Sequence, residues 1–301
     1  MRVTTQMAVD NLVGNLNRSF KRIVGFQEQL STGSRINTLS DDPAAVERSL
    51  ALRAELRNIE QFQKNIDDGT GWLELSEVNL SELETLFVEA RGLAVQGASS
   101  TYNAHQRLAV ADQVDKFLEH AVSLSESRYR GRYIFAGTQT ASPPYQAIRD
   151  GEGGILELSP AGDATGSIER EVADGKIMQV NVPGSEIFEG SLNAFDVLKD
   201  LRDALETNNI GAVRGSLTSL AEMREKISSV RGELGARVNR VELTRNVLDR
   251  VSIEMTSILS EDEDVDLTAA VVNLQQEQDV FQAALASGSS VIPQSLMDFI
   301  G

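Results

Sequence analysis

Both ends of this chain carry apolar residues at alternating spacings of three and four, the pattern of a helix that packs along one seam. Near the N-terminus these residues are Val9, Leu12, Leu16, Ile23, Phe26 and Leu30. Near the C-terminus they are Leu267, Leu274, Phe281 and Leu285. With only six prolines in 301 residues, long helices can run without interruption. The pattern predicts a coiled-coil helix at each end of the chain.

Residues that start or stop helices divide the helical parts of the sequence. Glycine favours helix C-termini, and Asp, Asn and Pro favour helix starts. We therefore expect one helix to end at Gly33 and others to begin at Asp42–Pro43, Asn103 and Asn193. Local propensity also predicts a break at residues 67–71, which contain two aspartates and two glycines.

The character of the sequence changes after Gly131. Residues 132–136, 155–158 and 177–182 are short runs typical of strands, and the segment around them is rich in Gly, Pro, Ser and Asp. These features predict a small β domain inserted between two helical halves. The expected fold is mainly α, an elongated helical bundle in which the N- and C-terminal coiled-coil helices pack together.

This nested order predicts three domains, two of them discontinuous. Residues 1–42 with 260–301 would form a terminal coiled-coil domain. Residues 43–137 with 191–259 would form a helical rod, and residues 138–190 would form the β-rich outer domain. Because one domain interrupts another, the two termini should lie together.

Charge is distributed unevenly between the two ends. The first 40 residues carry five basic and two acidic side chains, whereas the segment from Val251 onward has nine acidic side chains and no Lys or Arg. Opposite charges favour pairing of the two terminal helices.

The composition argues against several classes of function. A net charge of -17 disfavours binding to nucleic acid and to anionic membrane surfaces. The chain has no cysteine and only two histidines, His105 and His120, neither of them in the β domain. We expect no cofactor, no metal site and no catalytic site. Residues 1–11 show no apolar core of a signal peptide, so export would need another route.

The terminal helices need partners to be stable. Burial of a seam side chain contributes roughly 1.5–3 kcal/mol, whereas ordering each residue costs on the order of 1–2 kcal/mol. A pair of such helices is therefore marginal. We expect both ends to be disordered in a free monomer and to fold when neighbouring subunits cover their seams.

Short motifs at fixed places resemble those of the bacterial flagellins and their junction proteins. The first motif comprises Ser31, Thr32, Gly33, Arg35 and Asn37, followed by Asp41, Asp42 and Pro43. Residues 65–69, 89–96 and 276–287 resemble further motifs of the family. A last group resembles the junction-protein branch of the family and comprises Tyr133, Phe135, Gly137, Pro183 and Gly184.

The resemblance implies a structural subunit, not an enzyme, located where the flagellar hook meets the filament. It implies a homo-oligomer whose partners are hook-associated protein 1, flagellin and an export chaperone that holds the C-terminal helix before secretion. Export would follow the flagellar type III route to the extracellular flagellum. The resemblance also implies, against local propensity, that the helix continues through residues 67–71.

Three alternatives remain open at this point. The chain could be a flagellin, the subunit of the filament itself. It could house an enzyme in the central module, although no acid–base constellation is visible there. It could also be an intracellular coiled-coil scaffold.

Overall fold

The computed structural model of the protein describes residues 5–149 and 154–291. This part of the chain is mainly helical and contains an inserted β module, so the expected fold class is confirmed. It divides into two compact units, one of residues up to Asn58 with those from Arg250 onward, the other of Ile59–Asp249. This division does not test the three predicted domains, which stay a prediction.

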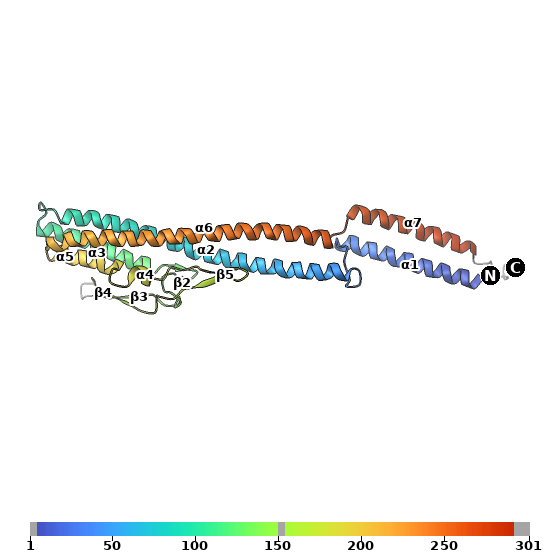
Figure 1. Ribbon diagram of the computed structural model, residues 1–301, viewed down its shortest axis with the longest axis horizontal. Helices are drawn as coiled ribbons and strands as arrows, with labels where there is room; N and C mark the ends of the chain where they lie inside the picture. The colour runs from blue at the N-terminus through green and yellow to red at the C-terminus, as the bar shows by residue number, and fades with distance from the viewer. Residues whose placement is uncertain (1–4, 150–153, 292–301) are drawn as a thin grey trace. The chain divides into compact units, whose positions relative to one another are not determined.

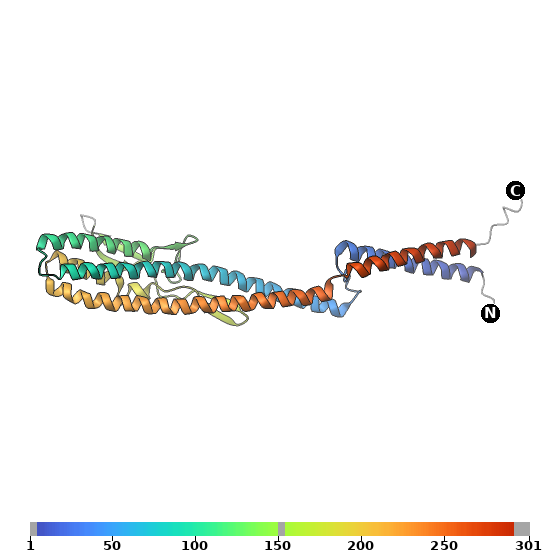
Figure 2. The same cartoon turned by 90° about the horizontal axis from the view of Figure 1, so that it is seen from above.

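The first unit pairs the helices from the two ends of the chain. α1 spans Thr5–Thr32 and α7 spans Leu267–Val291, and they lie side by side in both views (Figures 1 and 2). They run antiparallel, because the ring of Phe20 lies 6.2 Å from that of Phe281 while Leu12 packs against Gly288. The expected pairing of the terminal helices is therefore confirmed.

The second unit is built around a bundle of helices. Its members are α2 (Pro43–Gly97) from Ile59 onward, α3 (Ala104–Ser125), α5 (Ala194–Glu206) and α6 (Ile210–Glu263) as far as Asp249. Fully buried aliphatic and aromatic side chains from each helix form its core; they include Leu80, Phe87, Leu118, Leu198, Leu201 and Leu220. Aliphatic seams thus supply the core, in keeping with the low aromatic content of 5%.

Asparagine side chains begin two of these helices, as predicted. The Asn103 side chain accepts a hydrogen bond from the Gln106 backbone at 2.9 Å, and the Gln106 side chain accepts one from the Asn103 backbone at 2.9 Å. Asn193 accepts from the Asp196 backbone at 2.8 Å at the start of α5. These bonds satisfy amide groups that a helix N-terminus leaves unpaired.

The described residues of the β module form three two-stranded antiparallel hairpins and a short helix, α4 (Ser185–Phe188). The hairpins pair β1 (Arg128–Tyr129) with β2 (Arg132–Tyr133), β3 (Tyr145–Arg149) with β4 (Ile155–Pro160), and β5 (Glu169–Ala173) with β6 (Lys176–Gln179). The expected strand at 132–136 is shorter than predicted. Its last three residues are buried in the module, and the chain turns at Gly137 with φ +56°.

The break predicted at residues 67–71 is wrong, because α2 continues through it to Gly97. A Cβ atom on Gly69 would fall 2.7 Å from Val180, and one on Gly71 would collide with the hydroxyl end of the Tyr129 side chain. The glycines therefore let the β module lie directly on the helix, and this contact compensates for their low helix propensity. Asp68 contributes by pairing with Arg130 at 3.2 Å.

Among the residues that the structure describes, no helix is both long and apolar enough to cross a lipid bilayer.

Two glycines of α2 should respond in opposite ways to replacement by alanine. Gly71→Ala should lower the free energy of unfolding by about 1–3 kcal/mol, because the methyl group displaces Tyr129 from its contact with Trp72. Gly92→Ala is the matched control, since open space surrounds that position, and it should raise the free energy by about 0.5–1 kcal/mol. Urea denaturation measures both changes. Equal stabilisation of both variants would show that the close contact is unimportant.

Candidate assembly interface

The predicted N-terminal seam faces α7 along most of its length. Ile23 is buried, and the remaining described seam side chains of α1 are half-buried; these are Leu12, Leu16, Phe26 and Leu30. The backbone of Val9 belongs to α1, but its side chain lies outside the described residues. A single partner helix therefore covers the seam only in part.

The predicted C-terminal seam lies on one side of α7 but is covered unevenly. Leu274 and Phe281 are half-buried with Ala270 on the side that faces α1. Leu267 lies seven residues before Leu274 and Leu285 four residues after Phe281, so both share that side, but they are 56% and 48% exposed. A role of these residues in assembly stays a prediction.

A second apolar side of α1 is only partly covered by the described residues, and there the ring of Phe20 lies beside that of Phe281. Val13, Phe20 and Val24 are 49%, 56% and 44% exposed, and their spacing of seven and four places them on one side of the helix, next to the seam. Exposed valines and leucines also occur on α7, among them Leu267, Val271 and Leu285. An apolar surface of this kind marks a site of protein contact.

A polar contact fixes the register of the two helices. Arg22 donates two hydrogen bonds to the Glu277 carboxylate, at 2.8 and 3.0 Å, and buried Ser19 donates a third at 2.9 Å. The bonds from Arg22 and Ser19 lower the pKa of Glu277. Opposite charges on the two terminal helices thus meet at one point, as their sequences predicted.

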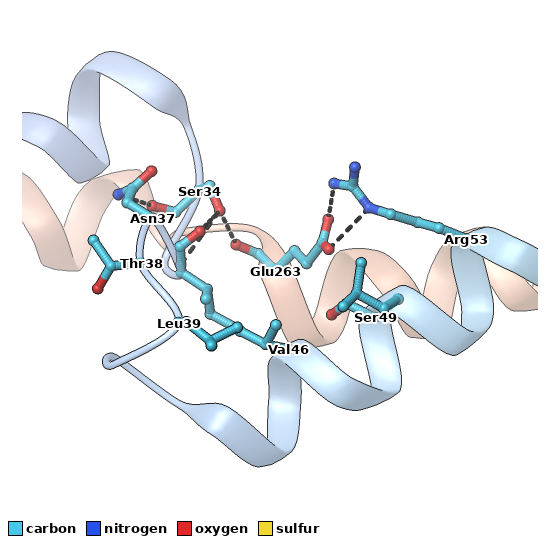
Figure 3. Close-up of a pocket in the computed structure, with 10 residues that line it drawn as sticks. Ser34, Asn37, Thr38, Leu39, Val46, Ser49, Arg53 and Glu263 are labelled. Carbon is cyan, nitrogen blue, oxygen red and sulfur yellow. Dashed lines mark hydrogen bonds and ion pairs between the residues drawn. The ribbon is translucent and has the colours of Figure 1, made fainter.

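The motif at residues 31–43 forms a hinge between α1 and α2 that is hydrogen-bonded to the end of α6 (Figure 3). α1 ends at Thr32, with Ser31 exposed, and Gly33 has φ +72°, which confirms the predicted helix stop. The backbone of Arg35 donates to Glu263 at 2.7 Å, and that of Val265 donates to Gly33 at 3.0 Å. The loop between α1 and α2 and the loop between α6 and α7 are therefore hydrogen-bonded to each other, although they are far apart in sequence.

Polar side chains hold the remainder of this loop. Asn37 donates from its side chain to the Ser34 carbonyl at 3.2 Å, and the Asp41 carboxylate accepts from the backbone of Thr38 at 2.7 Å. Hydrogen bonds from the backbone and side chain of Thr38, and from the backbone of Asn37, lower the pKa of Asp41. Asp42 then accepts from the Ala45 backbone at 3.0 Å, directly before Pro43 opens α2, so the predicted helix start is confirmed.

Two arginines of α2 bind the acidic end of α6. Arg48 contacts both carboxylate oxygens of Asp262, at 3.1 and 2.6 Å. Arg53 contacts both oxygens of Glu263, at 3.0 and 2.5 Å. Bidentate pairs of this kind fix orientation as well as distance. Sequence reasoning missed these arginines because they lie beyond the basic first 40 residues, and only the fold brings them to α6.

The second group of motif residues meets where the β module leaves the bundle. The backbone of Gly184 donates to the carbonyl oxygen of Phe135 at 3.0 Å. A Cβ atom on Gly184 would collide with that oxygen, so only glycine fits. Buried Tyr133 and Pro183 lie beside these two residues in the chain. The structure thus brings together motif residues that are about 50 positions apart in sequence.

Aromatic rings reinforce this junction. Phe188 lies 5.6 Å from Phe135, 5.5 Å from Tyr145 and 4.8 Å from Phe195, measured between ring centroids. Burial raises the pKa of the Tyr145 hydroxyl well above its ordinary range, with a smaller effect from the carboxylate of Glu189. Such contacts are worth more than their buried area alone. Sequence reasoning did not find this cluster, because its rings come from segments that only the fold brings together.

Within the described ranges, no group of His, Asp or Glu side chains has the arrangement of a metal site. The features that stand out are the partly exposed apolar surface of the terminal helices and the close attachment of the β module at Phe135 and Gly184.

Comparison with known proteins gives matches along most of the chain. The model of the bacterial flagellin N-terminal helical region matches residues 3–140, and that of the bacterial flagellin C-terminal helical region matches residues 217–300. The flagellin of Bacillus subtilis (strain 168) is 27% identical over 316 residues, and the match covers 100% of both chains. Flagellar hook-associated protein 3 of Escherichia coli (strain K12) is 24% identical, with 94% of this chain and 95% of that protein covered.

A solved structure shares the fold. It is described as a flagellar hook-associated protein from Vibrio parahaemolyticus, with a TM-score of 0.66 and 21% sequence identity. The match covers 74% of this chain and 100% of that chain.

Acid should weaken the hinge and the contact between α1 and α7. The pKa values of Glu277 and Asp262 are lowered by hydrogen bonds from Arg22 and Arg48 respectively. A carboxylate with a lowered pKa stabilises the fold above its unfolded pKa and loses that effect as the pH falls through its folded pKa. In a chain with α1 and α7 folded, we expect helix content, measured by circular dichroism, to stay constant from pH 7 to about 5 and to fall below about pH 4. Glu277→Gln should reduce the acid-dependent loss; an unchanged profile would contradict this assignment.

Proposed function

Because the chain belongs to the bacterial flagellin family, we propose that it is a structural subunit of the bacterial flagellum that joins the hook to the filament. The observation that carries the assembly role is the apolar side of α1 that the described residues leave about half exposed. Exposure of these apolar side chains to water is unfavourable in free energy. Repeated copies of one subunit can cover them by packing helix against helix.

The position at the junction is supported by the residues at the attachment of the β module. Tyr133, Phe135 and Gly137 come from the entry to the module, and Pro183 and Gly184 come from its exit. These residues resemble the junction-protein branch of the family, and one of them, Gly184, is restricted to glycine by the Phe135 carbonyl group. The match to hook-associated protein 3 along nearly the whole of both chains agrees with this proposal.

A second candidate is the filament subunit itself. The flagellin of Bacillus subtilis is similar over the full length of both chains, at slightly higher identity than hook-associated protein 3. Identity in this range does not separate two members of one family. The motifs at the attachment of the β module favour the junction protein.

The proposed partners follow from the same role. Copies of this chain would contact one another through α1 and α7. The assembled copies would contact hook-associated protein 1 on one side and flagellin on the other. A chaperone would hold α7 before export, since that helix presents exposed Val and Leu side chains. We propose export by the flagellar type III route to the cell exterior, and a three-part division into terminal, rod and outer domains. The role is structural and non-enzymatic.

Charges placed on the partly covered side of α1 should block assembly and spare the monomer. Val13→Asp and Val24→Asp replace exposed side chains, so monomer stability should change little. An assembled contact would have to bury the new charge, which should reduce incorporation into flagella by about tenfold or more. Asn11→Asp, at an exposed position on another side of α1, is the matched control. Immunoblots of sheared flagella measure incorporation; normal amounts of the Val24 variant would contradict the proposed interface.

Deletion of the gene distinguishes the two candidate functions. A junction subunit predicts intact hooks without filaments, loss of motility and unpolymerised flagellin in the medium. A filament subunit predicts hooks without filaments and no such flagellin, because the monomer itself is missing. Electron microscopy of the cells, together with gels of the medium, measures the difference. Full-length filaments on the deletion strain would exclude both.

A further inference from the structure

A cavity of about 220 Å³ lies in the second unit, where two hairpins of the β module meet α2. Its lining side chains come from α2, from β1 and β2 with the turn between them, and from β5; they are Asp68, Trp72, Tyr129, Arg130, Arg132 and Arg170. Three arginines and one aspartate leave two positive charges in excess. In a chain whose net charge is -17, this cavity is a local site of attraction for anions.

The one carboxylate of the cavity does not use up its arginines. Arg130 and Arg170 share Asp68, and each contacts it through one nitrogen, at 3.2 and 3.5 Å. Arg48 at the hinge, by contrast, binds its carboxylate through two nitrogens. Arg132 is exposed, and its side chain makes no hydrogen bond or ion pair with any residue that the structure describes. Because a guanidinium group has five N–H donors, the cavity retains donors for a further acceptor.

Backbone conformation and an aromatic ring orient one of these arginines. Arg130 has φ +49° and Gly131 has φ +80°, so the two residues form a tight turn between β1 and β2 whose first position favours Asn or Gly. The guanidinium group of Arg130 lies 5.2 Å from the centre of the Tyr129 ring, which in turn packs on buried Trp72. An arginine at such an unfavourable backbone position, placed over a packed ring, indicates a use for its charge there.

The donors of the cavity fit an oxyanion. Paired N–H groups of a guanidinium match two oxygens of a carboxylate or phosphate group. A cation would be repelled by the excess positive charge, and a neutral ligand would leave that charge unbalanced. The aromatic side chains of Trp72 and Tyr129 also line the cavity and contribute no competing negative charge.

We propose that this cavity binds one oxyanion, a carboxylate or phosphate group, through Arg130, Arg132 and Arg170. Asp68 holds two of these arginines in place, and Arg132 supplies charge that the described part of the chain leaves unmatched. The site lies within one chain and does not depend on the proposed function. Its oxyanion comes either from solution or, if the chain assembles as proposed, from an acidic side chain of a second copy.

Titration with free anions tests the site, and the single tryptophan of the chain, Trp72, reports on it by fluorescence. Inorganic phosphate or succinate should change the fluorescence of the full-length protein saturably, and sodium chloride at equal ionic strength should not. Arg132→Ala should raise the apparent dissociation constant about tenfold or more, through loss of a charge-assisted hydrogen bond. Arg224→Ala is the matched control, because it removes one exposed positive charge from α6 in the same unit. No saturable change in the wild-type protein, or an equal effect of the two substitutions, would overturn the proposal.

Assembly distinguishes the two sources of the oxyanion. Arg132→Glu would repel a carboxylate from a second copy, so its incorporation into flagella, in competition with the wild-type chain, should fall about tenfold relative to Arg224→Glu. Undiminished incorporation would reject the second copy as the source and leave the free anion that the titration detects. Absence of the wild-type chain from flagella would reject the proposed function without altering the titration.

Discussion

A helix can cover only one stripe of a partner helix, and this limit governs the first unit of the protein. α1 and α7 cover each other along one side, where Ile23 and Ala270 are buried, and each retains apolar side chains elsewhere. Added contacts within the chain could have removed this exposed surface, as they do in the bundle of the second unit. The two units thus differ in how fully they bury their apolar side chains. Leu80 and Leu198 of the second unit are buried, whereas Val13 and Val24 of the first are exposed.

The hinge shows how a polar segment maintains order next to this incomplete surface. The backbone bonds from Arg35 to Glu263 and from Val265 to Gly33 join two loops that would otherwise move separately. The bidentate pairs of Arg48 and Arg53 then hold the end of α6 against α2. Exposed ion pairs contribute little to stability singly. Here their main effect is to define direction, so that α1 and α7 leave the hinge in register.

The sequence predicted the features that depend on local chemistry. Gly33, Asn103 and Asn193 are recognisable because helix ends need residues that satisfy free amides or accept a positive φ angle. The continuity of α2 through Gly69 and Gly71 could not be predicted locally, because it depends on Val180 and Tyr129 from distant segments. The partner of Arg48 and the basic cavity beside Asp68 were hidden for the same reason: both depend on which segments the fold brings together. The exposure of Leu267, on the same side of α7 as half-buried Leu274, likewise depended on the position of α1.

The β module enters and leaves the bundle at one point, where Gly184 donates to Phe135. The segment between these two residues therefore begins and ends at nearly the same place, regardless of its length. The cost of closing a longer loop rises only slowly with the number of residues. An exposed turn such as the one at Gly175, where φ is +62°, could therefore carry an added peptide or a whole domain without disturbing the helices. The attachment makes this part of the molecule a natural place for variation in size and for the display of foreign sequences.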